Sequence, residues 1–551
     1  MLNMYKTKFL KYLFVLIYLL FLCSVLISRF YGISIRPMHC DEANQAYKAG
    51  ILLEKGLYKY DPHEHHGPLL YYATLPIFYF YGVHHFRDTN EIMFRAVPIL
   101  FSLLIFLSLL PIKKYIGLIG FIVSSILLAV SHAFFFYSRY YVHETLFVLF
   151  SYLFISSLWF YISKPNTLSA IFTGTTLSLA FATKETALIV FFTTTLSFIL
   201  TSVYLIKTSP FTGTDSVVLF HSLTWKEICK HIIVFSIAFF IPWLLLFSSF
   251  FTNKQGLLDF FRAYQTYLFR ASGEGSSGIH DKPWWYYLQI LTYFNKTVGP
   301  VWSEGFIILL CCIGIIFSLY FLIKIFIKKK CDVKEHILSS FYIFSFVPFF
   351  TTFLIFSLIP YKTPWNILFP LLGMIIFAGI GFQALWQKFS KIWTRSILSL
   401  ILLAGIYHLS YQTYQGNFIY FADISNPYVY AHTSTSLVKM MNRIYQLSDI
   451  LIKENQEPIV FVIDPINDYW PIPWYLRKID KKGFWSKIPS NIDNIPFFIV
   501  SPELMQKFDK SLNMPYMKEI YTIRPGVFRY LYIEQPLWDK FIEIQSTQKH
   551  S

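Results

Sequence analysis

Charged residues are scarce in this chain. Of its 551 residues only 14% are Asp, Glu, Lys or Arg, while 55% are hydrophobic. Soluble domains carry about 25% charged residues, and many apolar runs here reach the roughly 20 residues that cross a bilayer. These proportions exclude an ordinary soluble protein, because one core could not hide so many helices that are apolar all round. The sequence predicts a polytopic α-helical membrane protein.

The chain also lacks a cysteine framework, a cleavable leader and a repeat. Its six cysteines are scattered without a Cys-x-x-Cys pattern, so no disulfide framework is indicated. The N-terminal run KTKFLKYLFVLIYLLFLCSVLI has basic flanks but no small-residue cleavage site. It predicts an uncleaved first span and not a removed signal peptide.

The few charges follow a pattern along the chain. The formal net charge is +16, but most of the excess lies in short loops between apolar runs. This fits the positive-inside rule and argues against nucleic acid as a partner. About 11 spans are predicted, with a cytoplasmic N-terminus and an exported C-terminus. The first, third, fourth, tenth and eleventh cover about residues 11–29, 115–135, 145–163, 366–387 and 396–409.

Two regions divide the sequence. Residues 1–410 form the predicted transmembrane domain, with long external loops at 30–95 and 252–304. Residues 411–551 mix polar and apolar positions, and the strand-like runs EPIVFVID and IPFFIVS alternate with helix-like stretches. This tail predicts a small extracytoplasmic α/β domain, large enough to have its own core.

The first external loop opens on RPMHCDEANQAYKAG, residues 36–50. Asp41 and Glu42 would stand where the chain leaves the membrane, at the start of a helix-like run. Asp41 is interpreted in two ways. It is either a helix cap that the helix dipole favours, or a general base that takes a proton from an acceptor group.

The same loop carries the ionisable run YDPHEHHGPLLYY. Its histidines, His63, His65 and His66, could bind a metal, a phosphate or a sugar, and could equally be solvated. No metal or other cofactor is predicted as required, and a divalent metal stays possible.

Charges interrupt apolar runs at three further external turns. SRYYVHE contains Arg139, His143 and Glu144, FATKETA contains Lys184 and Glu185, and IPYKTPWN contains Lys362. Each turn alone could be interface anchoring by long basic side chains. Together, at one membrane face, they predict a shared pocket whose cations suit an anionic headgroup.

The second long loop contains GIHDKPWWYYL. Its polar residues and the adjacent Trp284 and Trp285 suit an interfacial helix, or stacking against a sugar. The sequon Asn295-Lys296-Thr297 also falls in this loop.

This ordered set of motifs resembles the GT-C glycosyltransferases, which include the protein O-mannosyltransferases and the lipid A aminoarabinose transferase. MHCDEA, YDPHEHHGPLLYY, SRYYVHE, FATKETA, HDKPWWYYL, IPYKTPWN, NPYVYAH and DYWPIPWYLR carry the resemblance. They resemble most closely a prokaryotic branch described as flippase-activity-associated membrane protein, near archaeal N-glycosylation genes. The HEHH cluster and His143 depart from the mannosyltransferase pattern.

The resemblance implies inverting transfer of a hexosyl or pentosyl group from a polyprenyl-phosphate donor to a glycan, lipid or protein acceptor on the extracytoplasmic face. It makes Asp41 the base, assisted by Glu42. The implied ligands of the donor phosphate are Arg139, Lys184, His280 and Lys362. The candidates for acceptor or metal contact are Glu144, His143, His63, His65 and His66, and those for stacking on substrate are Trp284 and Trp285.

These inferences imply a multi-pass protein of the plasma (inner) membrane that acts in glycosylation of the cell envelope, with membrane lipids around it. The alternatives are a flippase or transporter for lipid-linked sugars and a non-catalytic assembly factor. A transporter site would lie near the bilayer midplane, whereas the charges here gather at one face.

Overall fold

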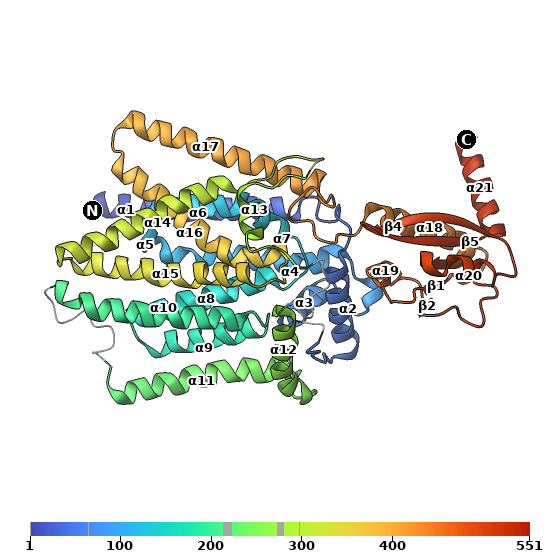
Figure 1. Cartoon of the computed structure of the whole chain (residues 1–551), viewed down its shortest axis with the longest axis horizontal. Coiled ribbons are helices and arrows are strands. Elements are labelled where there is room, and N and C mark those ends of the chain that lie inside the picture. The colour runs from blue at the N-terminus through green and yellow to red at the C-terminus, as the bar shows by residue number, and fades with distance from the viewer. Residues whose placement is uncertain (1, 64–65, 213–222, 273–279, 297, 551) are drawn as a thin grey trace.

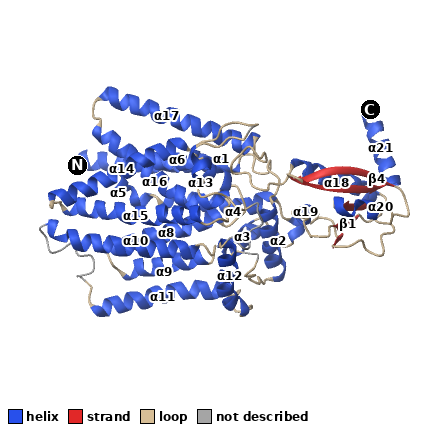
Figure 2. Cartoon of the chain, viewed as in Figure 1, coloured by secondary structure: helices blue, strands red, loops and turns tan. Residues whose placement is uncertain are grey.

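The computed structural model describes residues 2–63, 66–212, 223–272, 280–296 and 298–550, with side chains from residue 9 to 547. Long helices lie side by side in one bundle, and a small domain sits at one end of it (Figure 1). The N-terminus lies at the opposite end of the bundle from that domain. Strands β1 to β5 all belong to the C-terminal domain, as Figure 2 shows.

Within the described residues, nine helices are long and apolar enough to cross a membrane. Where the span and the helix differ, the span is given first and the helix that it contains or belongs to follows. Up to residue 247 the spans are Phe9–Phe30 in α1 (Leu2–Phe30), Glu91–Ile116 with α4 (Glu91–Ser108) and α5 (Lys113–Ile116), α8 (Glu144–Ser163), Ala187–Thr212 with α10 (Ala187–Thr208), and α11 (Trp225–Phe247). Beyond it they are α14 (Gly305–Lys328), α15 (Val333–Leu358), Pro364–Lys388 with α16 (Leu368–Lys388), and Ile392–Ile419 with α17 (Ile392–Tyr414). The prediction of a polytopic helical membrane protein is confirmed.

The predicted span at about residues 115–135 and the apolar run that ends at FATKETA correspond to shorter apolar helices. α6 (Leu118–Val130) ends where the Ser131 hydroxyl accepts a hydrogen bond from the Phe134 amide and caps α7 (His132–Tyr137). α9 (Thr167–Phe181) has 15 residues and packs against α8 and α11. The total of 11 spans therefore stays a prediction.

Glycines let the central helix α16 approach its neighbours closely. A Cβ at Gly314 of α14 would lie 2.0 Å from the Phe377 carbonyl oxygen, and one at Gly381 would lie 2.3 Å from the Leu310 oxygen. Small residues at such contacts allow tight packing between membrane helices, where no water is expelled to drive association.

The two long loops predicted to be external form short helices at the end of the bundle near the C-terminal domain (Figure 1). The first loop contains α2 (Cys40–Lys55), α3 (Leu69–Phe80) and η1 (Phe86–Asp88), and the second contains α12 (Gln255–Ala271) and α13 (Tyr286–Thr292). α12 buries one face, including Phe260 and Ala263, so it is an amphipathic helix laid against the bundle.

The C-terminal domain is a five-stranded sheet with helices. Its order is β2-β1-β3-β5-β4, in which β1 pairs parallel with β2 and β3, while β5 pairs antiparallel with β3 and β4. The elements are α18 (Thr435–Lys453), β1 (Ile459–Ile463), α19 (Ile472–Tyr475), β2 (Lys481–Trp485), β3 (Phe497–Val500), α20 (Met505–Asp509), β4 (Tyr516–Arg524), β5 (Val527–Glu534) and α21 (Gln535–His550).

The two predicted strand runs form β1 and β3, at the centre of the sheet. β3 is buried at all four positions, which explains its continuous apolar sequence. The predicted α/β tail is confirmed. α17 reaches Tyr414, a few residues past the predicted domain boundary at residue 411.

Candidate functional site

The first turn of α2 places two neighbouring carboxylates in different environments. His39 caps the helix: its Nδ1 accepts a hydrogen bond from the Asp41 amide at 3.0 Å, and the Glu42 carboxylate accepts one from the His39 amide at 3.1 Å. The interpretation of Asp41 as the cap is therefore wrong, because His39 occupies that position. The Asp41 side chain is 49% exposed, whereas that of Glu42 is fully buried.

The Glu42 carboxylate is saturated with donors. Oε1 accepts from Arg95 Nε at 2.8 Å and from the Tyr141 amide at 2.9 Å, and Oε2 accepts from Arg95 Nη2 at 2.8 Å. Burial alone would raise the pKa of Glu42, but Arg95 outweighs it and lowers the pKa to about 2. Glu42 is thus an ionised anchor between α2 and α4. Asp41 is the carboxylate of the pair whose side chain stays accessible.

A second group of charges meets at the turns before α8 and α10. Lys184 Nζ donates to Glu144 Oε1 at 2.6 Å and to Asn366 Oδ1 at 2.9 Å. The side chains of Lys184 and Glu144 are only 6% and 5% exposed. Desolvated charges of this kind persist only when each has a partner, so the pair holds three distant segments of the chain together.

The next residue, Glu185, binds a histidine of the first loop. His66 Nδ1 lies 2.7 Å from Glu185 Oε2, and the Tyr60 hydroxyl donates to Oε1 at 2.9 Å. The Tyr267 hydroxyl, from α12, lies 2.9 Å from the same His66 nitrogen. Burial would raise the pKa of Glu185, but the neighbouring His66 and the hydrogen bonds lower it.

These groups line one cavity of about 480 Å³. Its polar lining includes Asp41, Asn44, Gln45, His66, His143, Glu144, Lys184, Glu185, Tyr267, Arg270 and Asn366. Apolar side chains of α10, α12 and α15 complete it, among them Leu188, Ile189, Leu268, Ile355 and Phe356. A cavity with both kinds of lining suits an amphiphilic ligand with a charged head.

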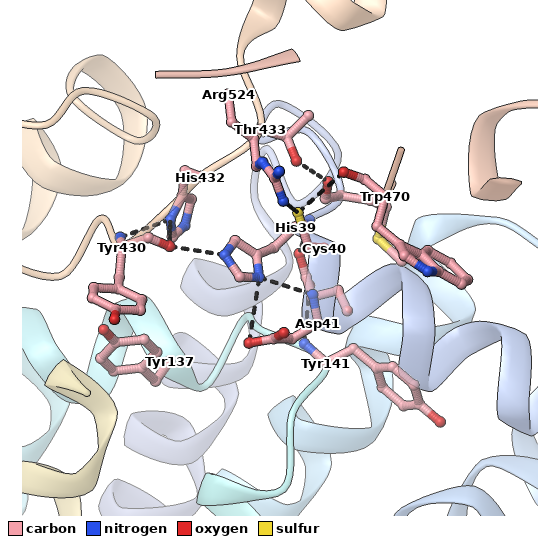
Figure 3. A network of polar contacts seen from close by, with 12 residues as sticks. His39, Cys40, Asp41, Tyr137, Tyr141, Tyr430, His432, Thr433, Trp470 and Arg524 are labelled. Atoms are coloured by element: carbon pink, nitrogen blue, oxygen red, sulfur yellow. Dashed lines mark hydrogen bonds and ion pairs between the residues drawn. The ribbon is translucent and has the colours of Figure 1, made fainter. Parts of the chain in front are cut away.

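Residues of the C-terminal domain and of the segment before it form hydrogen bonds to Met38, His39 and Cys40, which directly precede Asp41 (Figure 3). The hydrogen bonds join His39 Nε2 to Tyr430 O (2.8 Å), Thr433 Oγ1 to Met38 O (2.6 Å), Cys40 Sγ to Trp470 O (3.3 Å) and Arg524 Nη1 to Cys40 Sγ (3.3 Å). Burial lowers the pKa of His39. Its Nδ1 accepts a hydrogen bond from the backbone amide of Asp41, so the ring is neutral with its proton on Nε2. The C-terminal domain therefore helps to fix the start of α2.

Two of the predicted phosphate ligands point away from the cavity. Arg139 is buried, donates to the Tyr31 carbonyl at 2.7 Å and packs on the rings of Phe135 and Phe418. Lys362 Nζ donates to the carbonyl oxygens of two residues, Lys282 and Ile359. Neither residue lines the cavity, and their role in binding the donor stays a prediction.

His280 and the tryptophans lie beside the cavity. His280 stacks on Tyr361, a lining residue, with 4.4 Å between ring centroids, and its Nδ1 contacts the Tyr430 hydroxyl. Trp284 and Trp285 are 59% and 50% exposed and meet edge to face outside the lining. Sugar stacking on them stays a prediction.

The histidine run of the first loop is split between environments. His66 lines the cavity, whereas the His63 ring contacts Thr266 at 3.3 Å on the exposed side of α12. His65 lies outside the described residues. His143 packs edge-on to the His66 ring, with 5.3 Å between centroids, and its Nε2 contacts the Gly67 carbonyl.

Several lining residues were missed by sequence reasoning. Asn366 stands inside IPYKTPWN, which was noted for its lysine only, and Glu185 was noted in FATKETA but given no role. Tyr264, Tyr267 and Ala271 recur at helical spacing on α12 and share the face that lines the cavity, together with Arg270. That spacing could have marked the face, although not what it covers.

The first half of the chain is similar to a known protein family. Residues 18–258 match the family model of dolichyl-phosphate-mannose-protein mannosyltransferase. No curated protein matches the chain.

Two solved structures of ArnT share the fold over nearly the whole chain. ArnT from Cupriavidus metallidurans bound to undecaprenyl phosphate is 13% identical with a TM-score of 0.57, over 94% of this chain and 98% of that one. Its apo state is 12% identical, with the same TM-score and coverage. The S. cerevisiae Pmt1-Pmt2 complex bound to the sugar donor is 18% identical over 43% of this chain and 34% of that one, with a TM-score of 0.33.

The membrane bundle, the external helices around a charged cavity and the small sheet domain define the ArnT-like GT-C fold. The family model covers residues 18–258, which is less than half of the chain, and the fold of the whole chain is similar to that of ArnT. Both findings agree with the resemblance to GT-C glycosyltransferases noted in the sequence, while the closer resemblance to the flippase-activity-associated branch stays a prediction.

Proposed function

We propose that this protein transfers a sugar from a polyprenyl-phosphate donor to an acceptor on the extracytoplasmic side, with inversion at the anomeric carbon. One observation carries the proposal: a half-exposed carboxylate, Asp41, shares a cavity with Lys184, Arg270 and the apolar side chains of three helices. Catalysis of this reaction needs a base, cations for the leaving phosphate and room for a lipid.

The proposed mechanism assigns each group a task. Asp41 takes the proton of the acceptor hydroxyl as its oxygen attacks the anomeric carbon. The bond from that carbon to the phosphate oxygen breaks, and the electron pair leaves with the polyprenyl phosphate. Lys184 and Arg270 stabilise the charge that develops on the phosphate, which a preorganised cation does best in a site from which water is excluded. Leu188, Ile355 and the other apolar lining residues contact the start of the polyprenyl chain.

The position of the site within the cell envelope is part of the proposal. The N-terminus and the C-terminal domain lie at opposite ends of the bundle (Figure 1). A cytoplasmic N-terminus, as the basic loops predict, puts the cavity and the sheet domain outside. The membrane proposed is the plasma membrane.

Reconstituted transfer tests the function. Purified protein in proteoliposomes is offered a panel of polyprenyl-phosphate hexoses and pentoses with glycan, lipid and peptide acceptors. Transfer of at least one sugar with inverted configuration is the expected result. Movement of the donor between leaflets without transfer would overturn the proposal in favour of a flippase.

A divalent metal stays a separate proposal. Among the described residues, no group of three or more His, Cys, Asp or Glu side chains is placed to hold an ion. Activity after chelation and after addition of Mn²⁺ or Mg²⁺ tests it.

Replacing Lys184 by Met is expected to raise the KM for the donor about 10- to 100-fold, because one charge-assisted hydrogen bond to phosphate is lost. The variant also leaves Glu144 buried without its partner. The double variant Lys184→Met/Glu144→Gln removes that penalty, so it should recover thermal stability but not donor affinity. Recovery of both would assign Lys184 a structural role only.

A further inference from the structure

Among the described residues that line the cavity, the carboxylates outnumber the permanently charged cations. Three carboxylates, Asp41, Glu144 and Glu185, face two permanent cations, Lys184 and Arg270. A donor phosphodiester brings one more negative charge. An anion placed in a poorly solvated site needs a compensating positive charge. A cationic group beyond Lys184 and Arg270 is therefore needed when the donor is bound.

His66 is built to supply it. Its Nδ1 is held by Glu185 Oε2 at 2.7 Å, and Glu185 is itself fixed by the Tyr60 hydroxyl at 2.9 Å. The carboxylate is 6% exposed and the imidazole 25%. Within the described residues both hydrogen-bond contacts of the ring use Nδ1, so Nε2 is left for a ligand in the cavity. A carboxylate behind an imidazole fixes the ring and stabilises its protonated form.

The ionisable groups around His66 come from several elements. Tyr267 of α12 stacks on the ring at 5.7 Å between centroids, and Arg270 of the same helix donates to the His63 carbonyl at 2.8 Å. From the turn before α8, His143 meets the ring edge-on. Lys184 precedes Glu185 in the turn before α10 and is neutralised by Glu144. Glu185 is thus the carboxylate directly paired with His66.

We propose that the Glu185–His66 dyad is the general acid of the reaction, which protonates the leaving phosphate. This step rests on the proposed function. As the bond between the anomeric carbon and the phosphate oxygen breaks, that oxygen takes the proton from His66 Nε2. The acceptor oxygen forms the new bond to the anomeric carbon, and its proton goes to Asp41. Exchange with water then restores both groups.

The chemistry of the leaving group explains why a titrating acid suits this site. The donor phosphate is a diester with one charge, and the product is a monoester whose second pKa is about 6. Imidazole exchanges its proton between about pH 5 and 8. Acid and leaving group are therefore matched near neutral pH, where proton transfer is most effective.

The pH dependence of kcat at saturating donor tests the dyad. In the wild type kcat should fall as the pH is raised, because the proton donor is lost. His66→Gln should lower kcat about 100-fold or more at pH 6.5 and abolish this alkaline decrease. His66→Lys should keep a proton donor and move the decrease to higher pH. His84→Gln, an exposed histidine of the same loop, is the matched control and should leave the profile unchanged.

The variant Glu185→Gln is a second test, because the direction in which it shifts the pH profile of kcat can be predicted. Loss of the adjacent negative charge disfavours the imidazolium, so the alkaline decrease should begin at a lower pH than in the wild type. A profile that is the same in wild type and His66→Gln would overturn the dyad and leave the proposed function intact. Failure of the wild type to transfer any sugar would instead overturn the proposed function, and the acid step with it.

Discussion

Replacing Asp41 by Asn lowers the rate of sugar transfer by about 100- to 10,000-fold, the contribution of a well-placed general base. The amide is nearly the same size as the carboxylate but cannot take the acceptor proton. The fold should not change, because His39 and not Asp41 caps α2, and the Asp41 side chain is half exposed. The measurement is initial transfer rate in proteoliposomes at saturating donor and acceptor.

Asp88→Asn is the control for this substitution. Asp88 lies exposed on η1 in the same external loop and does not line the cavity, so its transfer rate should equal that of the wild type. The two variants must also match the wild type in thermal unfolding. Full activity of Asp41→Asn would show that another group removes the proton.

The sequence predicted the membrane helices well because their signal is local. An apolar run of about 20 residues has few alternatives to a membrane span. The run at residues 115–135 shows the limit of this reasoning. It is predominantly apolar, yet it divides into α6 and α7 at Ser131, since a serine can cap a new helix as readily as it can sit inside one.

The candidate site was predicted in part, for a comparable reason. Charged residues at one membrane face indicated a pocket, and Asp41 and Lys184 do line it. Arg139 was predicted to line the pocket by the same reasoning. It is buried outside the cavity, where it donates a hydrogen bond to the Tyr31 carbonyl and packs on the Phe418 ring. The sequence shows that a charge is present but does not show whether its partner is a ligand or the protein itself.

The features of the site that the sequence did not predict depend on packing between segments that are distant along the chain. Neighbouring residues on a helix point about 100° apart, so Asp41 and Glu42 could not be told apart before the position of α4 was known. Similarly, Arg270 and Tyr267 reach the cavity because α12 lies across the first loop. No local pattern in the second loop encodes that contact.

The buried pair Glu42–Arg95 carries the largest expected effect on stability. Glu42→Gln should destabilise the protein by about 3–5 kcal/mol, because Arg95 would remain charged in a site with no exposed surface. Thermal or chemical unfolding of the solubilised protein measures the loss. Breaking the exposed pair Arg87–Asp480, whose side chains are 51% and 75% exposed, by Asp480→Asn should change the stability by under about 1 kcal/mol.

Acid titration separates the charge of Glu42 from its packing. The pKa of Glu42 is lowered in the fold to about 2 from an ordinary value of 4.5. Its ionised form therefore contributes fully above about pH 4.5, and the contribution is lost as the pH falls toward 2. The stability difference between wild type and Glu42→Gln should shrink over that interval. The double variant Glu42→Gln/Arg95→Met should be more stable than Glu42→Gln alone, since it leaves no unpaired charge. A double variant no more stable than the single one would mean that Arg95 acts through its bonds to the carbonyls of Ile33 and Arg36, and not through Glu42.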